Sequence, residues 1–100
     1  MLATAKAAEP VWHLFPLFIA RGDREELRDH LKVSQVQSGV HYPRIIPDQA
    51  VLRCTEVFKI AIEPANARHL ASAELSLPVH PFLEDNEIAT IISACQGFQN

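Results

Sequence analysis

The longest apolar run of the chain, residues 11–20, limits what this sequence can form. The run reads VWHLFPLFIA and is interrupted by His13 and Pro16. It is much shorter than the roughly 20 residues that span a bilayer, and it ends without the cleavage pattern of a secretory signal. Both of its alternating sets are mainly apolar, which predicts a strand covered on both faces. Because proline donates no backbone hydrogen bond, Pro16 predicts a bulge or a sheet edge.

Composition and charge narrow the class of protein further. The 100 residues predict one domain, and 48% hydrophobic with 21% charged residues is typical of a globular chain with a packed core. Nine basic residues against 12 acidic ones leave a net charge of −3, which argues against a nucleic-acid binder. Cys54 and Cys95 form no CxxC pair, so a reducing cytoplasm is expected. We expect residues 1–10 to be a tail or the stub of an upstream helix, and residues 11–100 to be the domain.

A helix signal follows the apolar run. Asp23 comes directly after Gly22 and can cap the first turn, and Glu26 stands three residues later as the second member of a capping box. Leu27 and Leu31 follow at helical spacing. These residues predict a helix that begins at Asp23 and buries its leucines.

The middle of the chain alternates between strand and loop signals. Residues 36–42 alternate in polarity and predict a half-exposed strand, and residues 44–62 predict a loop with one or two helical turns. Pro64 suits the first turn of a further helix. The apolar segment 75–77 then predicts a strand, and the helix before it carries one narrow stripe of residues: Ala67, Leu70, Ala71 and Glu74.

The last segment, from Glu84 onward, has the spacing of an amphipathic helix packed by one face. Its apolar positions are Ile88, Ile91, Ile92, Cys95 and Phe98. The predicted order is strand, helix, strand, loop, helix, strand, helix. This order predicts an α+β fold in which helices pack on one side of a small sheet.

Few residues stand in a pattern that indicates chemistry. The five histidines fall in five separate segments without metal-ligand spacing, and the three glycines form no phosphate loop. His41 and Tyr42 leave the end of a predicted strand into a loop, where binding groups are common. An equally good interpretation is a capped strand end with Tyr42 half buried against its neighbours.

Three segments stand in the order WHLFPLFIARGDREELRDHLK, GVHYP and AELSLPVHPFLEDNEI. In this order and spacing they resemble the C-terminal small domain of the DegT/DnrJ/StrS family of pyridoxal-phosphate-dependent sugar aminotransferases. The family has an "HLF" strand, then a "G-x-HYP" turn, then "LSLP-x-x-P-x-L" before its last helix. The resemblance covers about residues 11–99.

The resemblance implies a fold-type-I aminotransferase. In that family pyridoxal phosphate carries an amino group from an amino acid, usually glutamate, to a keto sugar attached to a nucleotide. The lysine that holds the cofactor lies in the family's large domain, upstream of the segments that match here. We therefore expect this chain to bind no cofactor by itself, to have no catalytic residue of its own, and to have that large domain as its partner.

The resemblance also implies a substrate-binding site. His41 and Tyr42 match the "HYP" turn, which in the family borders the active site and helps to position the sugar substrate, and Pro43 shapes that turn. After this turn the family commonly continues with Pro and then Leu-His-x-Gln. Here residues 44–49 read RIIPDQ, so that Gln49 alone keeps a match.

Two hypotheses about the whole chain follow. As the small domain of a larger enzyme, it would expose an apolar face around Trp12, Phe15 and Phe18 and could form a homodimer through it. As a free-standing binding or interaction module derived from that domain, it would be a monomer or a defined symmetric dimer.

Overall fold

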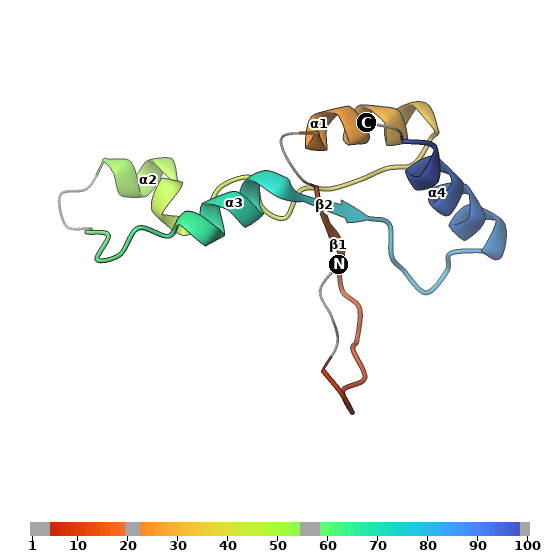
Figure 1. The fold of residues 1–100 in the computed structure, drawn as a ribbon, viewed down its shortest axis with the longest axis horizontal. Coiled ribbons are helices and arrows are strands. Elements are labelled where there is room, and N and C mark those ends of the chain that lie inside the picture. The colour runs from red at the N-terminus through yellow and green to blue at the C-terminus, as the bar shows by residue number, and fades with distance from the viewer. Residues whose placement is uncertain (1–4, 20–22, 55–58, 99–100) are drawn as a thin grey trace.

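The computed structural model describes residues 5–19, 23–54 and 59–98. Its elements follow the order β1 (Phe15–Phe18), α1 (Arg24–Val33), the 3-10 turn η1 (Ile46–Asp48), α2 (Ala50–Arg53), α3 (Ala65–Ala73), β2 (Glu74–Leu77) and α4 (Asp85–Gly97). In Figure 1, α1 and α4 gather at one side of the short sheet, while α3 and α2 extend away on the other. The fold is α+β, which confirms the predicted class.

The sheet has two antiparallel strands in the described residues, with Phe15 opposite Leu77 and Phe18 opposite Glu74. On the other side of β2, Gly39 and Ser76 exchange both of their backbone hydrogen bonds, at 2.9 and 2.8 Å. The backbone groups of Ser76 therefore face Gly39, and its pair with Pro16 is of the non-hydrogen-bonded kind. Pro16 lies in an edge strand with regular register, so the edge that it predicted is confirmed and no bulge is needed.

The predicted strand at residues 11–20 is too long. β1 has four residues, and all of them are half-buried. Its core-side face is covered, but its opposite face lines an open groove that includes Phe18. The expectation of cover on both faces is therefore wrong for this chain.

The predicted strand at residues 36–42 is also wrong. Gly39 forms one isolated bridge, and the segment leaves β2 directly afterwards. The backbone N–H of His41 donates to the carboxylate Oε2 of Glu74 at 2.6 Å, so a side chain accepts it here. The alternation of polar and apolar residues is thus accompanied by a single bridge to β2 and does not mark a strand.

The core lies between α1, β2 and α4. Leu27 and Leu31 of α1 pack with Val36, Leu75 of β2 and Ala94 of α4. Burial of this kind contributes about 25 cal/mol per Å² of apolar surface. Leu31 and Leu75 are fully buried, so these two side chains mark the centre of the core.

Helix α1 confirms the predicted leucine face but not the predicted cap. Asp23 occupies the N-cap position, yet its side chain makes no capping hydrogen bond, so the capping box with Glu26 is wrong. The guanidinium of Arg24 instead donates to the backbone oxygen of Ala71 at 2.9 Å. This bond ties the start of α1 to the last turn of α3. Gly22 lies outside the described residues.

Helix α4 begins with a complete capping box. Glu84 and Glu87 each accept a backbone hydrogen bond from the other's position, which satisfies two donors that the helix start leaves free. The predicted apolar stripe packs only in part. Ile91 and Cys95 contact the core, whereas Ile88 is 41% and Ile92 50% exposed.

The segment before β2 corrects one further expectation. Pro64 is the N-cap of α3, and the helix ends at Ala73, so Glu74 belongs to β2 and not to the helical stripe. Ala73 accepts a hydrogen bond from the backbone of Ile19 at 2.8 Å, which extends the pairing beyond β1. Within residues 44–62, η1 and α2 confirm the predicted helical turns, and residues 55–58 lie outside the described part.

Candidate functional site

The open face of the sheet forms the floor of a groove of about 600 Å³, called here the sheet groove. Alternation along the strands places Phe18 and Glu74 on this face and Leu75 on the core face. The small-residue stripe of α3 also lines the groove, as do residues 41, 42 and 44–47. The sheet therefore separates the packed core from an open, largely apolar site.

The predicted apolar face around Trp12, Phe15 and Phe18 is divided between these two sides. Phe15 pairs with Leu77 and lies on the core side, where the ring of Trp12 packs against it with centroids 5.4 Å apart. Phe18 lines the sheet groove. Successive strand residues point to opposite faces, so these three aromatic residues do not form one patch.

The structure places His41 and Tyr42 in the rim of the sheet groove. Their rings meet edge to face with centroids 5.6 Å apart. Tyr42 is 70% exposed, so it does not pack as the half-buried cap of a strand end. Both side chains remain free to meet a ligand.

Gln49, the third predicted substrate-binding residue, is not among the residues that line the groove. Its side-chain amide donates to the backbone oxygen of Arg44 at 3.4 Å, a long bond that spans the loop. Arg44 itself lines the groove, and no ion-pair partner is found for it among the described residues. Arg44 therefore brings a positive charge to the groove.

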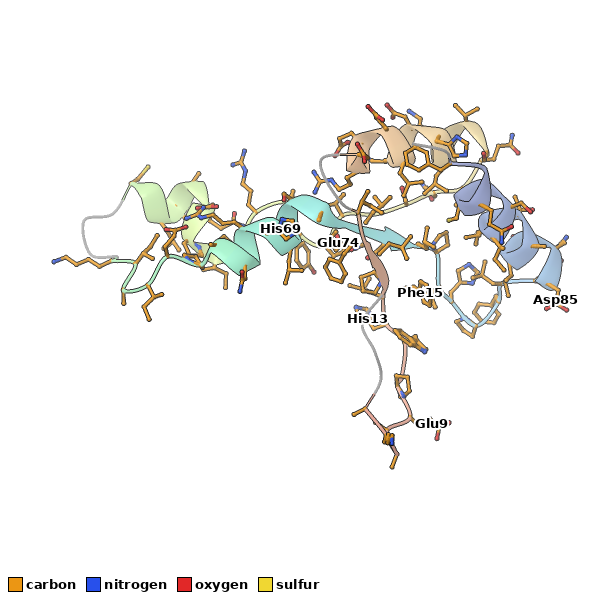
Figure 2. All side chains as sticks on the ribbon, in the orientation of Figure 1. Glu9, His13, Phe15, His69, Glu74 and Asp85 are labelled. Carbon is orange, nitrogen blue, oxygen red and sulfur yellow. The ribbon has the colours of Figure 1, made fainter. Side chains whose placement is uncertain are left out.

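Glu74, like Arg44, lines the groove and was not predicted from the sequence as a site residue. Figure 2 shows it where α3 passes into β2, and it is only 5% exposed while lining the sheet groove. Its Oε2 accepts the backbone N–H of His41, and its Oε1 accepts the hydroxyl of Ser76 at 2.5 Å. The alternation of Glu74 and Ser76 with two leucines is the signal that places both polar side chains on one strand face.

Gly39 leaves room for the imidazole of His41. A Cβ atom at Gly39 would lie 2.6 Å from Cε1 of that ring, closer than real contacts allow. The missing side chain thus lets His41 fold back over the bridge between Gly39 and Ser76. Gly39 and His41 line a second groove of about 410 Å³, together with His13 and His80.

No metal or membrane site emerges from the part of the chain that the structure describes. Although three histidines line the second groove, residues 5–19, 23–54 and 59–98 contain no group of three or more His, Cys, Asp or Glu residues placed to hold a metal ion. Within the same ranges, no helix is both long and apolar enough to span a bilayer.

Ion pairs between residues that do not line the groove connect two of the elements that form it. Arg68 of α3 donates from Nε to Glu63 at 2.6 Å and from Nη1 to Asp48 of η1. Hydrogen bonds to these carboxylates, that of Glu63 first, raise the pKa of Arg68 above its ordinary value. The network fastens η1 to α3, and residues of both elements line the sheet groove.

Comparison with known proteins places the chain. The model of the DegT/DnrJ/EryC1/StrS aminotransferase family matches residues 1–96. A relative from Streptomyces venezuelae, described as a dTDP-3-amino-3,4,6-trideoxy-alpha-D-glucose transaminase, is 33% identical over 95 aligned residues that cover 91% of this chain. The chain spans only 23% of that curated relative's length. Since the family model matches nearly the whole chain, this protein belongs to the DegT/DnrJ/EryC1/StrS aminotransferase family.

Proposed function

We propose that this chain is the C-terminal small domain of a pyridoxal-phosphate-dependent aminotransferase that transfers an amino group from an amino acid such as glutamate to a nucleotide-linked keto sugar. The observation that carries the proposal is the sheet groove, whose rim is the "HYP" turn with His41 and Tyr42. The relative from Streptomyces venezuelae is named for a transamination that yields a nucleotide-linked amino sugar.

The groove has the chemistry that such a ligand requires. Its volume of about 600 Å³ lies within the roughly 300–1,000 Å³ of small-molecule sites. The walls are apolar and can pack on a sugar ring or a base, while Tyr42 and His41 offer hydrogen bonds and Arg44 offers a charge for an anionic group. In this proposal His41 and Tyr42 contact the substrate, and Gln49 supports the loop that carries them.

The cofactor itself does not fit the residues of this chain. A Schiff base needs a lysine in a site that lowers its pKa, but Lys6, Lys32 and Lys59 are all exposed and line neither groove. This distribution supports a division of labour in which a large domain holds pyridoxal phosphate and this chain completes the substrate site.

A chimeric enzyme tests the proposal. We would replace the matching segment of the Streptomyces venezuelae transaminase with this chain and measure amino transfer to the relative's own keto-sugar substrate. We expect an active chimera, and we expect His41→Ala and Tyr42→Phe each to lower kcat/KM by about tenfold or more, because each removes a hydrogen bond at the substrate.

Val33→Ala is the matched control, because Val33 is 86% exposed on α1 and does not line the sheet groove. A folded, cofactor-loaded chimera whose activity is unaffected by both groove variants would contradict the proposal.

A further inference from the structure

We propose that Glu74 is a positioning residue, which turns the backbone at His41 away from the sheet and so presents His41 and Tyr42 to the sheet groove. The part of this inference that concerns substrate rests on the proposed function above. The part that concerns the turn rests on the structure alone.

The register of the sheet supports this role. Gly39 pairs with Ser76 in antiparallel fashion, so a continued ladder would bring His41 opposite Glu74 and its N–H to the backbone oxygen of that residue. The N–H donates instead to the side-chain Oε2 of Glu74, at 2.6 Å. The carboxylate therefore substitutes for a backbone partner, and the chain can leave the strand direction without losing the hydrogen bond.

The surroundings of Glu74 hold the carboxylate in place. A carboxylate on a residue that is only 5% exposed is costly unless hydrogen bonds stabilise it. Oε1 accepts the hydroxyl of Ser76, and Ser76 is in turn fixed by its two backbone bonds to Gly39. Gly39, Ser76, Glu74 and His41 are thus connected in this order by hydrogen bonds. Glu74 and His41 line the sheet groove, and Gly39 and Ser76 line the second groove.

A simpler arrangement would serve stability equally well. An apolar residue at position 74 would suit a different loop, one in which residues 41–47 continued along β2, because an ordinary ladder would then satisfy the His41 N–H without a buried carboxylate; replacing both partners of such a buried bond is often nearly neutral. The carboxylate sets the direction in which the backbone turns at His41. That direction brings His41 and Tyr42 to the rim of the sheet groove. This is why we assign Glu74 to the site and not only to the fold.

Two substitutions separate these roles. In Glu74→Gln, the amide oxygen can still accept the His41 N–H, so the turn is retained. In Glu74→Ala, the N–H loses its partner and the turn is released. Glu26→Ala is the control, because it removes an exposed carboxylate from α1.

The first measurement uses the 100-residue chain and needs no ligand. Amide hydrogen exchange of His41, followed by NMR, should quicken by about tenfold or more in Glu74→Ala. It should change by less than about threefold in Glu74→Gln and Glu26→Ala. Unchanged exchange at His41 in a folded Glu74→Ala chain would overturn the inference, whatever the chain's function.

The second measurement uses the chimeric enzyme. We expect Glu74→Ala to raise KM for the keto-sugar substrate by about tenfold with a smaller change in kcat, and Glu74→Gln to restore most of the loss. A chimera that is inactive while the exchange result holds would defeat the proposed function and leave the turn assignment standing. An active chimera with an unchanged KM in Glu74→Ala would refute the role of Glu74 in the site.

Discussion

At the scale of single residues, the site depends on what small and buried side chains allow their neighbours to do. Gly39 has no Cβ where the imidazole of His41 lies, and Glu74 accepts the backbone N–H of the same histidine. The space at Gly39 therefore accommodates the ring of His41, and the carboxylate of Glu74 holds its backbone N–H. Gly39, which has no side chain, and Glu74, which is buried, thus determine the orientation of the exposed His41.

Gly39→Ala should displace the imidazole of His41. The new Cβ would lie 2.6 Å from the ring, so the ring must rotate away, whereas the backbone pairing with Ser76 can remain. We expect large chemical-shift changes at His41 and Tyr42 in the NMR spectrum and little change elsewhere. Gly97→Ala is the control, since its Cβ would meet only His30 at an ordinary 3.8 Å. Unaltered ring signals of His41 would show that this contact does not hold the ring.

Sequence reasoning identified part of this arrangement. The "HYP" motif singled out His41 and Tyr42, and both line the groove. The prediction for Gln49 rests on a single matching letter, and its side chain bonds to the backbone of Arg44 and does not line the groove. Glu74 was assigned to a helical stripe because the boundary between α3 and β2 has no local signal such as glycine or proline, and helix ends are uncertain by one or two residues.

At the scale of elements, the helix ends show how local and long-range signals differ. The capping box of α4 is formed by Glu84 and Glu87 within one turn. The start of α1 is held instead by Arg24, which reaches the backbone of Ala71 in α3. Spacing alone does not ensure the first kind of contact, since Asp23 and Glu26 have the same spacing and form no box. Spacing cannot indicate the second kind, because that contact depends on how the elements pack.

The first turn of α1 should titrate in acid. Hydrogen bonds from Arg24, and then from Arg28, hold the pKa of Glu25 below its ordinary value of 4.5. Since the folded pKa is lowered, this contribution to stability is fully present above the unfolded pKa and is lost as the pH falls through the folded pKa. We expect an NMR titration of the Glu25 carboxyl to have its midpoint below 4.5.

Variants of the two arginines give the order of these effects. Arg24→Gln should raise the midpoint of Glu25 toward its ordinary value, and Arg28→Gln should raise it by less, because the Arg24 bond is the larger cause. Lys32→Gln, which removes an exposed charge elsewhere on α1, should leave the midpoint in place. A larger effect from Lys32 than from Arg24 would contradict the assignment to hydrogen bonding.

The elements themselves were predictable where periodicity and burial agree. The spacing of Leu27 and Leu31 predicted α1 correctly, and both leucines are buried. Residues 36–42 alternate as a strand does, but only Gly39 finds a partner on β2. Alternating polarity indicates that the backbone is extended. Whether another strand pairs with it depends on the tertiary structure.

At the scale of the whole molecule, the chain exposes more surface than its mass requires. A compact monomer of 11.2 kDa would have an accessible area of about 5,700 Å², whereas this chain has 8155 Å². Its radius of gyration is 16.5 Å, against about 13 Å for a compact domain of 100 residues. This excess supports the proposal that a larger partner covers part of the surface, including the outer isoleucines of α4.

Because the core is small, shortening a single core side chain should destabilise the fold. Leu31 has no exposed surface, so Leu31→Ala should lower the free energy of unfolding by about 2–5 kcal/mol. Val33→Ala, on the exposed side of the same helix, should change it by less than about 0.5 kcal/mol. Urea unfolding followed by circular dichroism measures both. Equal effects of the two substitutions would show that the core is not centred on Leu31.

The molecule as a whole was predicted by resemblance more than by pattern. Composition and periodicity indicated an α+β chain with a packed core, and the family model confirms the aminotransferase family over residues 1–96. The extended shape could not be predicted from composition. A chain that buries its hydrophobic residues in its own core and a chain that buries some of them against a partner can both have 48% of them.

The position of Pro16 has a consequence for aggregation. An edge strand normally offers a row of free backbone donors to any other chain, and β1 is such an edge in the described residues. Because the backbone groups of Ser76 face Gly39, the nitrogen of Pro16 faces outward, and it carries no hydrogen to donate. A second molecule cannot extend the sheet in register at that point. Growth of the sheet along the edge of β1 is therefore disfavoured at Pro16.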